Sequence, residues 1–128
     1  MTVYLTPEQV LFIHARLISE TGGEHGILDL GHLLSAVERP KVTFDQEELY
    51  PDLFSKTAAL FDSLIRNHPF LDGNKRTAIT AAGLFLVQNG YRLSASNEEV
   101  VDFALACAQA QLSLEEIKDW FEGNSGKI

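Results

Sequence analysis

The sequence predicts an all-α fold: a single domain built as a bundle of about six helices with a short flap. Three observations predict it. The chain has 128 residues, enough for one ordinary domain and too few for two. Apolar side chains recur at helical spacing, and capping residues mark the helix starts. Neither a repeat nor an internal linker interrupts the chain, so the expected domain spans residues 1–128, with 123–128 as a frayed tail.

The helices follow in order from residues that start and stop helices. Thr6 is an expected N-cap, with Pro7 at the first helical position and Gln9 as its capping-box partner. The helix expected from Asn74 to Asn89 is apolar on most sides, which predicts a place in the middle of the domain. The other expected starts are Asp29, Asp52, Ser96 and Ser113, and the expected stops include Gly22, Pro40 and Gly90.

Two segments are expected to be extended rather than helical. Residues 91–93 form a brief connection. The other segment alternates polar and apolar side chains and contains β-branched residues, which predicts a short strand or flap. Its residues are Lys41, Val42, Thr43, Phe44 and Asp45. Phe44, Leu49 and Tyr50 are candidates for partner contacts, although a core position is favoured for Leu49.

Composition excludes several classes of function. Eighteen acidic residues against ten basic ones give a net charge of −8, which argues against direct DNA binding and against an anionic membrane surface. Cys107 is the only cysteine, so no internal disulfide can form and a reducing compartment is expected. The sequence shows neither a signal peptide nor an apolar run long enough for a membrane span. These features predict a cytoplasmic protein.

The segment from Arg66 to Thr77 does not have the pattern of a core-packing element, because it combines a loop and a helix start with charged side chains. The first N–H groups of a helix lack intrahelical partners and favour anions such as phosphate. Lys75 and Arg76 add cationic donors, and Gly73 lets a ligand approach the backbone. The segment therefore predicts an anion site, to which Arg66 would add positive potential. Taken singly, each residue is better explained as a solvated or capping side chain.

Two further side chains in this segment suggest chemistry. Asp72 is its one carboxylate, and a carboxylate beside bound phosphates typically binds Mg²⁺. His68 is a candidate general base for a hydroxyl nucleophile. Phe70 is expected to be a buried anchor for the loop. A P-loop is excluded, because its first glycine is absent and no strand precedes the segment.

Other candidates have weaker support. His14, His25 and His32 lack the spacing of metal ligands, so a structural role is favoured over a metal site shared with His68. His14 is expected in the core or in the wall of the site. Cys107 is expected to be a small buried hydrophobe rather than a nucleophile.

The run His68-Pro69-Phe70-Leu71-Asp72-Gly73-Asn74-Lys75-Arg76-Thr77 resembles the signature of the Fic/Doc superfamily, with the lysine of its Doc (death-on-curing) branch. The resemblance extends over most of the chain, including the opening Leu-Thr-Pro-Glu and Asn89-Gly90. It implies an all-α Fic fold and a toxin of a bacterial toxin–antitoxin system. Such toxins use ATP and Mg²⁺ to phosphorylate a threonine of translation elongation factor Tu, which inhibits translation. Their Phd-like antitoxin folds a C-terminal segment onto the toxin.

The resemblance also implies residue roles. His68 would be the base and Asp72 the Mg²⁺ ligand, with Lys75 and Arg76 also catalytic. The flap at residues 41–45 would dock the target. The implied nucleotide and phosphate ligands are Gly73, Asn74, Lys75, Arg76 and Thr77.

Departures from the related adenylyltransferases bear on the reaction. Lys75 and Ile79 replace a glycine and a second arginine of those enzymes, which favours γ-phosphoryl transfer over nucleotidyl (AMPylation-type) transfer. Thr80 stands where some Doc toxins have asparagine, which leaves the acceptor open. Lys118 replaces the hydroxyl residue of the inhibitory helix of autoinhibited Fic proteins, so inhibition in trans is expected. The alternatives are nucleotidyl transfer to a protein hydroxyl and a catalytically inactive antitoxin-binding module.

Overall fold

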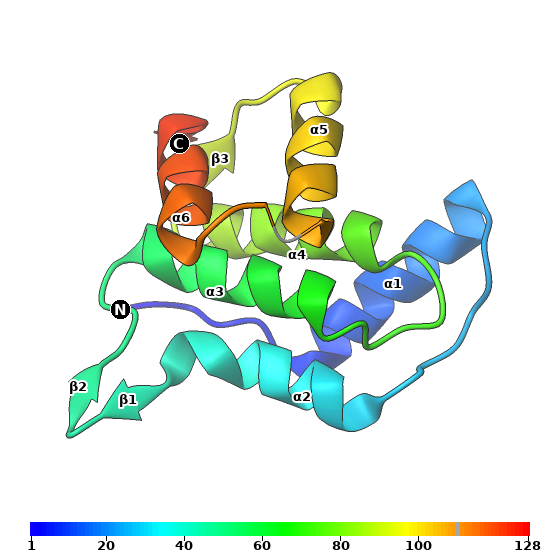
Figure 1. The fold of residues 1–128 in the computed structure, drawn as a ribbon, viewed down its shortest axis with the longest axis horizontal. Helices are drawn as coiled ribbons and strands as arrows, with labels where there is room; N and C mark the ends of the chain where they lie inside the picture. The colour runs from blue at the N-terminus through cyan, green and yellow to red at the C-terminus, as the bar shows by residue number, and fades with distance from the viewer. Residues whose placement is uncertain (110) are drawn as a thin grey trace.

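Two antiparallel helices, α3 and α4, run through the middle of the molecule (Figure 1). The computed structural model of the protein describes residues 1–109 and 111–128. Within these residues the fold has six α-helices and two small antiparallel sheets, which confirms the predicted all-α class. The elements are α1 (Pro7–Thr21), α2 (Leu30–Glu38), the 3₁₀ turn η1 (Arg39–Lys41), β1 (Thr43–Phe44), β2 (Glu47–Glu48), α3 (Leu53–Arg66), α4 (Asn74–Gln88), β3 (Tyr91–Leu93), α5 (Asn97–Ala108), α6 (Leu114–Gly123) and β4 (Ser125–Lys127).

The helix starts confirm the capping predictions. Four helices, α1, α3, α5 and α6, begin with complete capping boxes, and Asp29 caps α2 through the amide of His32. Helix α4 differs, because its N-cap is Gly73 in a left-handed conformation, with φ at 79°, and no side chain caps it. The first amides of α4 are therefore left for another partner.

The core gathers around α3, on which every residue from 56 to 65 is buried. An aromatic cluster joins α3 to α5 and α6: Phe103 stacks on Trp120 at 3.8 Å between ring centroids, and Phe61 and Phe121 meet edge to face at 5.2 Å. Figure 1 shows α2 on one side of the central pair and α5 and α6 crossing it on the other. No helix among the described residues is long and apolar enough to cross a membrane.

The C-terminal segment corrects one prediction. Residues 125–127 form β4, which pairs antiparallel with β3, with Tyr91 opposite Lys127 and Leu93 opposite Ser125. The amide of Ile128 also donates to the carbonyl of Gly90 at 3.0 Å. The expected frayed tail is therefore wrong. Its short polar sequence carries no strand signal of its own, because the pairing depends on the distant edge of β3.

The predicted flap is a hairpin, but it lies far from the motif. Strands β1 and β2 pair with Phe44 opposite Glu47, while Lys41 belongs to η1. The hairpin precedes α3 and the 67–73 loop follows it, so the 14 residues of α3, about 20 Å of helix, separate the two. Figure 1 shows them at opposite ends of the molecule. Leu49 is 53% exposed, so the favoured core position for it is wrong.

Candidate functional site

The 67–73 loop carries the motif from the end of α3 to the start of α4. Its anchor is Phe70, only 1% exposed, as expected. Gly73 is required by conformation and by space, because its φ is positive and an added Cβ would lie 3.0 Å from Cδ1 of Ile18. His68 also has a positive φ, of 48°, and its side chain is exposed. The loop thus buries its middle and leaves His68 at the surface.

Asn74 braces the loop from the first turn of α4. Its Oδ1 accepts a hydrogen bond from the amide of Phe70 at 3.0 Å, and its Nδ2 donates to the carbonyl of Phe70 at 2.9 Å. The same Nδ2 lies 3.1 Å from Nδ1 of His68. Because Phe70 fixes the orientation of the amide, Nδ1 of His68 is the acceptor of this bond, and the neutral ring then carries its proton on Nε2. Asn74 is 8% exposed, so its side chain serves the loop rather than a ligand.

His14 forms the wall behind the loop, one of the two positions expected for it. The side chain is 4% exposed, and Nε2 lies 2.8 Å from the carbonyl oxygen of Asp72. Its ring stacks on Phe70, with centroids 3.8 Å apart and planes at 6°. The backbone of Asp72 is therefore tied to the interior while its carboxylate stays at the surface.

The carboxylate of Asp72 accepts two backbone hydrogen bonds. Oδ1 accepts from the amide of Gly73 at 2.8 Å, and Oδ2 accepts from the amide of Glu24 at 3.3 Å. A Cβ added at Gly23 would lie 2.6 Å from Oδ2, so only glycine lets this segment lie so close to the carboxylate. Asp72 forms no ion pair with any described residue, and the described residues offer no group of three or more metal-ligating side chains. A cation at Asp72 would need further oxygen ligands from substrate and water.

The expected cations and phosphate ligands do not all meet at the start of α4. Lys75 is exposed and has no ion-pair or hydrogen-bond partner for its side chain among the described residues. Arg76 donates to Oγ1 of Thr21 and, at 3.3 Å, to the carbonyl of Gly22. Its guanidinium therefore lies between the end of α1 and Gly73, where an added Cβ would be 3.5 Å from Nη2. Thr77 is 1% exposed and faces the core, out of reach of a surface phosphate.

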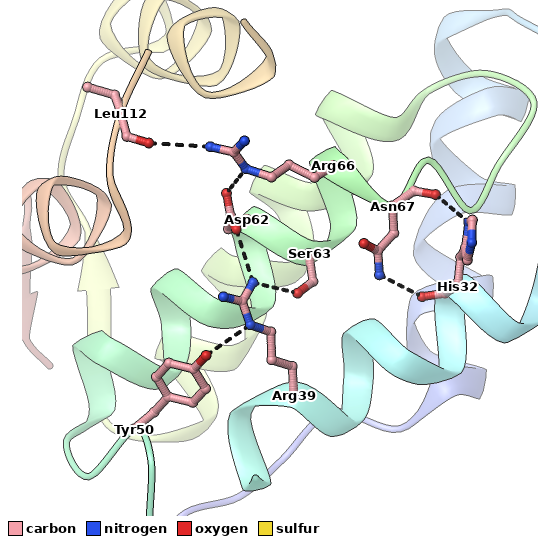
Figure 2. Close-up of polar contacts among 8 residues, drawn as sticks. All are labelled: His32, Arg39, Tyr50, Asp62, Ser63, Arg66, Asn67 and Leu112. Atoms are coloured by element: carbon pink, nitrogen blue, oxygen red, sulfur yellow. Dashed lines mark hydrogen bonds and ion pairs between the residues drawn. The ribbon is translucent and has the colours of Figure 1, made fainter. Parts of the chain in front are cut away.

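Arg66 belongs to a different network, shown in Figure 2. Its Nε donates to Oδ1 of Asp62, and its Nη2 donates to the carbonyl of Leu112 at 3.3 Å. Oδ2 of Asp62 accepts from Arg39 at 3.0 Å, and Arg39 also donates to the hydroxyl of Tyr50 at 3.0 Å. The guanidinium of Arg66 is thus held by Asp62, one turn earlier on α3, and by the carbonyl of Leu112, and it makes no contact with the motif loop among the described residues. Beside this network, Asn67 donates to the carbonyl of His32 at 3.3 Å.

The sequence did not reveal which segment lies beside the loop. Ile27 and Phe70 form an antiparallel bridge, with the amide of Leu28 donating to the carbonyl of Pro69 at 2.8 Å and the amide of Leu71 donating to Gly26 at 3.2 Å. The α1–α2 connection, and not the hairpin at residues 43–48, therefore pairs with the motif loop. The glycines at positions 22, 23 and 26 could have indicated this neighbour, because glycine permits two backbone segments to approach closely.

Comparisons with known proteins identify the family of the chain. The Fic/DOC family model matches residues 4–86. The chain is 47% identical over 95 residues to a protein named Toxin Doc from Mycolicibacterium smegmatis, covering 74% of this chain and 71% of that protein. It is 33% identical over 116 residues to the Protein kinase doc of Escherichia phage P1, covering 91% and 90% of the two chains. The motif, the helical fold and these matches agree: the chain belongs to the Doc family of the Fic/Doc superfamily.

Proposed function

We propose that this protein is the toxin of a toxin–antitoxin pair and a kinase that transfers the γ-phosphate of ATP to a hydroxyl of a protein. The observation that carries the proposal is the uncapped start of α4, with Asp72 and Lys75 exposed beside it. The first bond of its ladder runs from the amide of Thr77 to Gly73 at 2.9 Å, so the amides of residues 74–76 precede it and face a ligand. The names of the two relatives, a toxin and a protein kinase, support the same reaction.

The phosphates of ATP bind to the α4 amides and to the ammonium of Lys75. Asp72 fits a Mg²⁺ ion shared with these phosphates, because it is an exposed carboxylate with no cationic partner among the described residues. When bound, Mg²⁺ neutralises phosphate charge. Arg76 holds the end of α1 against α4 through its Nη1, and its Nε and Nη2, which have no partner among the described residues, are the atoms that contact phosphate.

His68 accepts the proton as the substrate hydroxyl attacks. The new bond joins the hydroxyl oxygen to the γ-phosphorus, the bond from that phosphorus to the bridging oxygen breaks, and ADP leaves. Nε2 can accept a proton only if the neutral ring holds its own proton on Nδ1, which the contact with Asn74 disfavours. Substrate binding therefore has to turn the exposed ring of His68 away from Asn74.

We place this reaction in the cytoplasm, with a threonine of elongation factor Tu as the acceptor and a Phd-like antitoxin as the inhibitor. The toxin relative supports an antitoxin partner. The partner is tested by co-purification: a candidate antitoxin expressed from the same operon should bind this chain and suppress its activity. An antitoxin that binds without suppressing activity would contradict inhibition in trans.

The reaction is tested by incubating the protein with purified elongation factor Tu, or with a bacterial extract, and ATP labelled at either the γ- or the α-phosphate. Label transferred from the γ position alone supports the kinase, and label from the α position supports nucleotidyl transfer instead. His68→Ala should abolish transfer. His25→Ala is the matched control, because His25 is an exposed histidine with no hydrogen-bond partner among the described residues. Transfer from neither position by the folded protein would leave a binding module.

A further inference from the structure

His32 on α2 and Asn67 at the end of α3 are joined by two hydrogen bonds, which Figure 2 shows. Nδ1 of His32 lies 2.7 Å from the carbonyl oxygen of Asn67, and Nδ2 of Asn67 donates to the carbonyl of His32 at 3.3 Å. Because a carbonyl oxygen only accepts, Nδ1 of the ring carries a proton and donates it. The ring reaches Asn67 because His32 lies in the first turn of α2, where Asp29 accepts from its amide, and helical side chains lean toward the N-terminus.

The carbonyl that His32 bonds belongs to the peptide group that leads into His68. The carbonyl of Asn67 and the amide of His68 lie in one plane, so the bond from His32 fixes the plane from which the φ of His68 is measured. That φ is 48°, in the left-handed region that a residue with a Cβ seldom adopts. Such a conformation persists only where the surrounding contacts determine it.

The backbone on the other side of His68 is held by the same part of α2. The ring of Pro69 fixes its own φ, and its carbonyl accepts from the amides of Leu28 and Asp29 at 2.8 and 3.1 Å. The start of α2 thus holds the backbone both before and after His68. Of these three bonds, the one from His32 is made by a side chain, so a substitution can remove it alone.

We infer that His32 is a positioning residue for His68, an inference that rests on the proposed role of His68 as the base. In this structure the ring of His68 also contacts Nδ2 of Asn74 at 3.1 Å, and the proposed reaction requires the ring to leave Asn74. Once the ring has turned, the bonds of the neighbouring backbone hold His68 in place. Without the bond from His32, the φ of His68 relaxes toward the common negative values, which redirects its side chain.

The exposure of His32 argues against a role in general stability. Its side chain is 54% exposed, and Oδ2 of Asp29 lies 3.5 Å from its Nε2, a surface contact of the kind that contributes little. Helix α3 also ends without help from His32, because the amide of Asn67 donates to the carbonyl of Ser63 at 2.9 Å. The bond from His32 therefore acts on the geometry of the motif loop more than on the free energy of unfolding.

The test compares His32→Leu with His32→Asn in the full-length protein. Leucine has a branched side chain without a donor, whereas Nδ2 of asparagine stands where Nδ1 of histidine stands and can donate. Leucine is the better helix former, so helix propensity and donation to Asn67 change in opposite directions between the two variants. His25→Leu is the matched control, because His25 is exposed and has no hydrogen-bond partner among the described residues.

Two readouts are taken: transfer of the γ-phosphate of ATP to elongation factor Tu, and the NMR coupling between the amide and Hα protons of His68, which reports its φ. His32→Leu should lower kcat about tenfold or more, because a misplacement of about 1 Å costs about 10²-fold in rate. Its KM for ATP should stay within about twofold and its urea midpoint should not fall. His32→Asn should restore kcat, His25→Leu should change nothing, and the coupling of His68 should change in His32→Leu alone.

Each other outcome is decisive as well. An unchanged coupling in His32→Leu would show that other contacts fix His68, and a loss of kcat that His32→Asn does not recover would show that the donor is not what matters. A raised KM for ATP at unchanged kcat would place His32 at the nucleotide instead of at the base. If the wild type transfers no phosphate, the proposed kinase fails, while a coupling that changes in His32→Leu and not in His32→Asn still supports the positioning of His68.

Discussion

Replacing His14 by phenylalanine isolates one hydrogen bond beneath the motif loop. The new ring keeps the volume and the stacking on Phe70 but cannot donate to the carbonyl of Asp72, which His14 contacts at 2.8 Å. A buried acceptor left without its donor costs about 1–3 kcal/mol. The side chain is 4% exposed, so water replaces the donor poorly and we expect a loss of about 2 kcal/mol in the free energy of unfolding.

Urea titration followed by circular dichroism measures this loss as a lower midpoint at unchanged slope. His14→Gln, which restores a donor near the position of Nε2, should recover part of it. His25→Phe is the matched control, since His25 is exposed and should stay within about 0.5 kcal/mol of the wild type. If His14→Phe is as stable as His25→Phe, the bond to Asp72 contributes nothing and His14 is only a packing residue.

Three more predictions concern regions away from the motif. Gln46 has a φ of 68° in the two-residue turn between β1 and β2, so Gln46→Gly should stabilise the fold by about 0.5–1 kcal/mol in urea titration, and any loss would contradict strain there. Truncation after Asn124 removes β4 from β3, so the melting temperature should fall, and an unchanged value would mean that the pairing contributes no stability. Burial raises the pKa of the Cys107 thiol from 9.0 to about 12, so the folded protein holds this proton more tightly than the unfolded chain. Its contribution to stability should be complete below pH 9 and be lost as the pH rises towards 12, and the thiol should react with a disulfide reagent at pH 8 only after unfolding.

The helix starts could be predicted from sequence because their causes are local. A capping box needs two residues three positions apart, such as Ser96 with Glu99, and both lie within the first turn of the helix that they start. The strand β4 could not be predicted in this way. Its residues gain backbone partners only after the chain has brought them to β3, more than thirty positions earlier.

The site shows the same division between local and distant causes. The uncapped start of α4 follows from Gly73, whereas the separation of the hairpin from the 67–73 loop depends on the length and direction of α3. Two expectations that the structure does not support, Arg66 at the anion site and Thr77 as a phosphate ligand, could have been questioned from the sequence. Asp62 stands four positions before Arg66, which is helical ion-pair spacing. Thr77 and Ala81 follow Asn74 at the period of a buried helix face.

The ten-residue motif contains buried side chains, which hold the loop in place, and exposed side chains, which are free to contact a ligand. Phe70, Asn74 and Thr77 point inward, with at most 8% of each exposed, while His68 and Lys75 are exposed. The buried backbone groups of a loop need hydrogen-bond partners for the loop to hold its conformation. Here the side chain of Asn74 bonds both the amide and the carbonyl of Phe70. Loss of activity on changing Asn74 would therefore report a collapsed loop, whereas loss on changing Lys75 at unchanged stability would report a missing contact to the ligand.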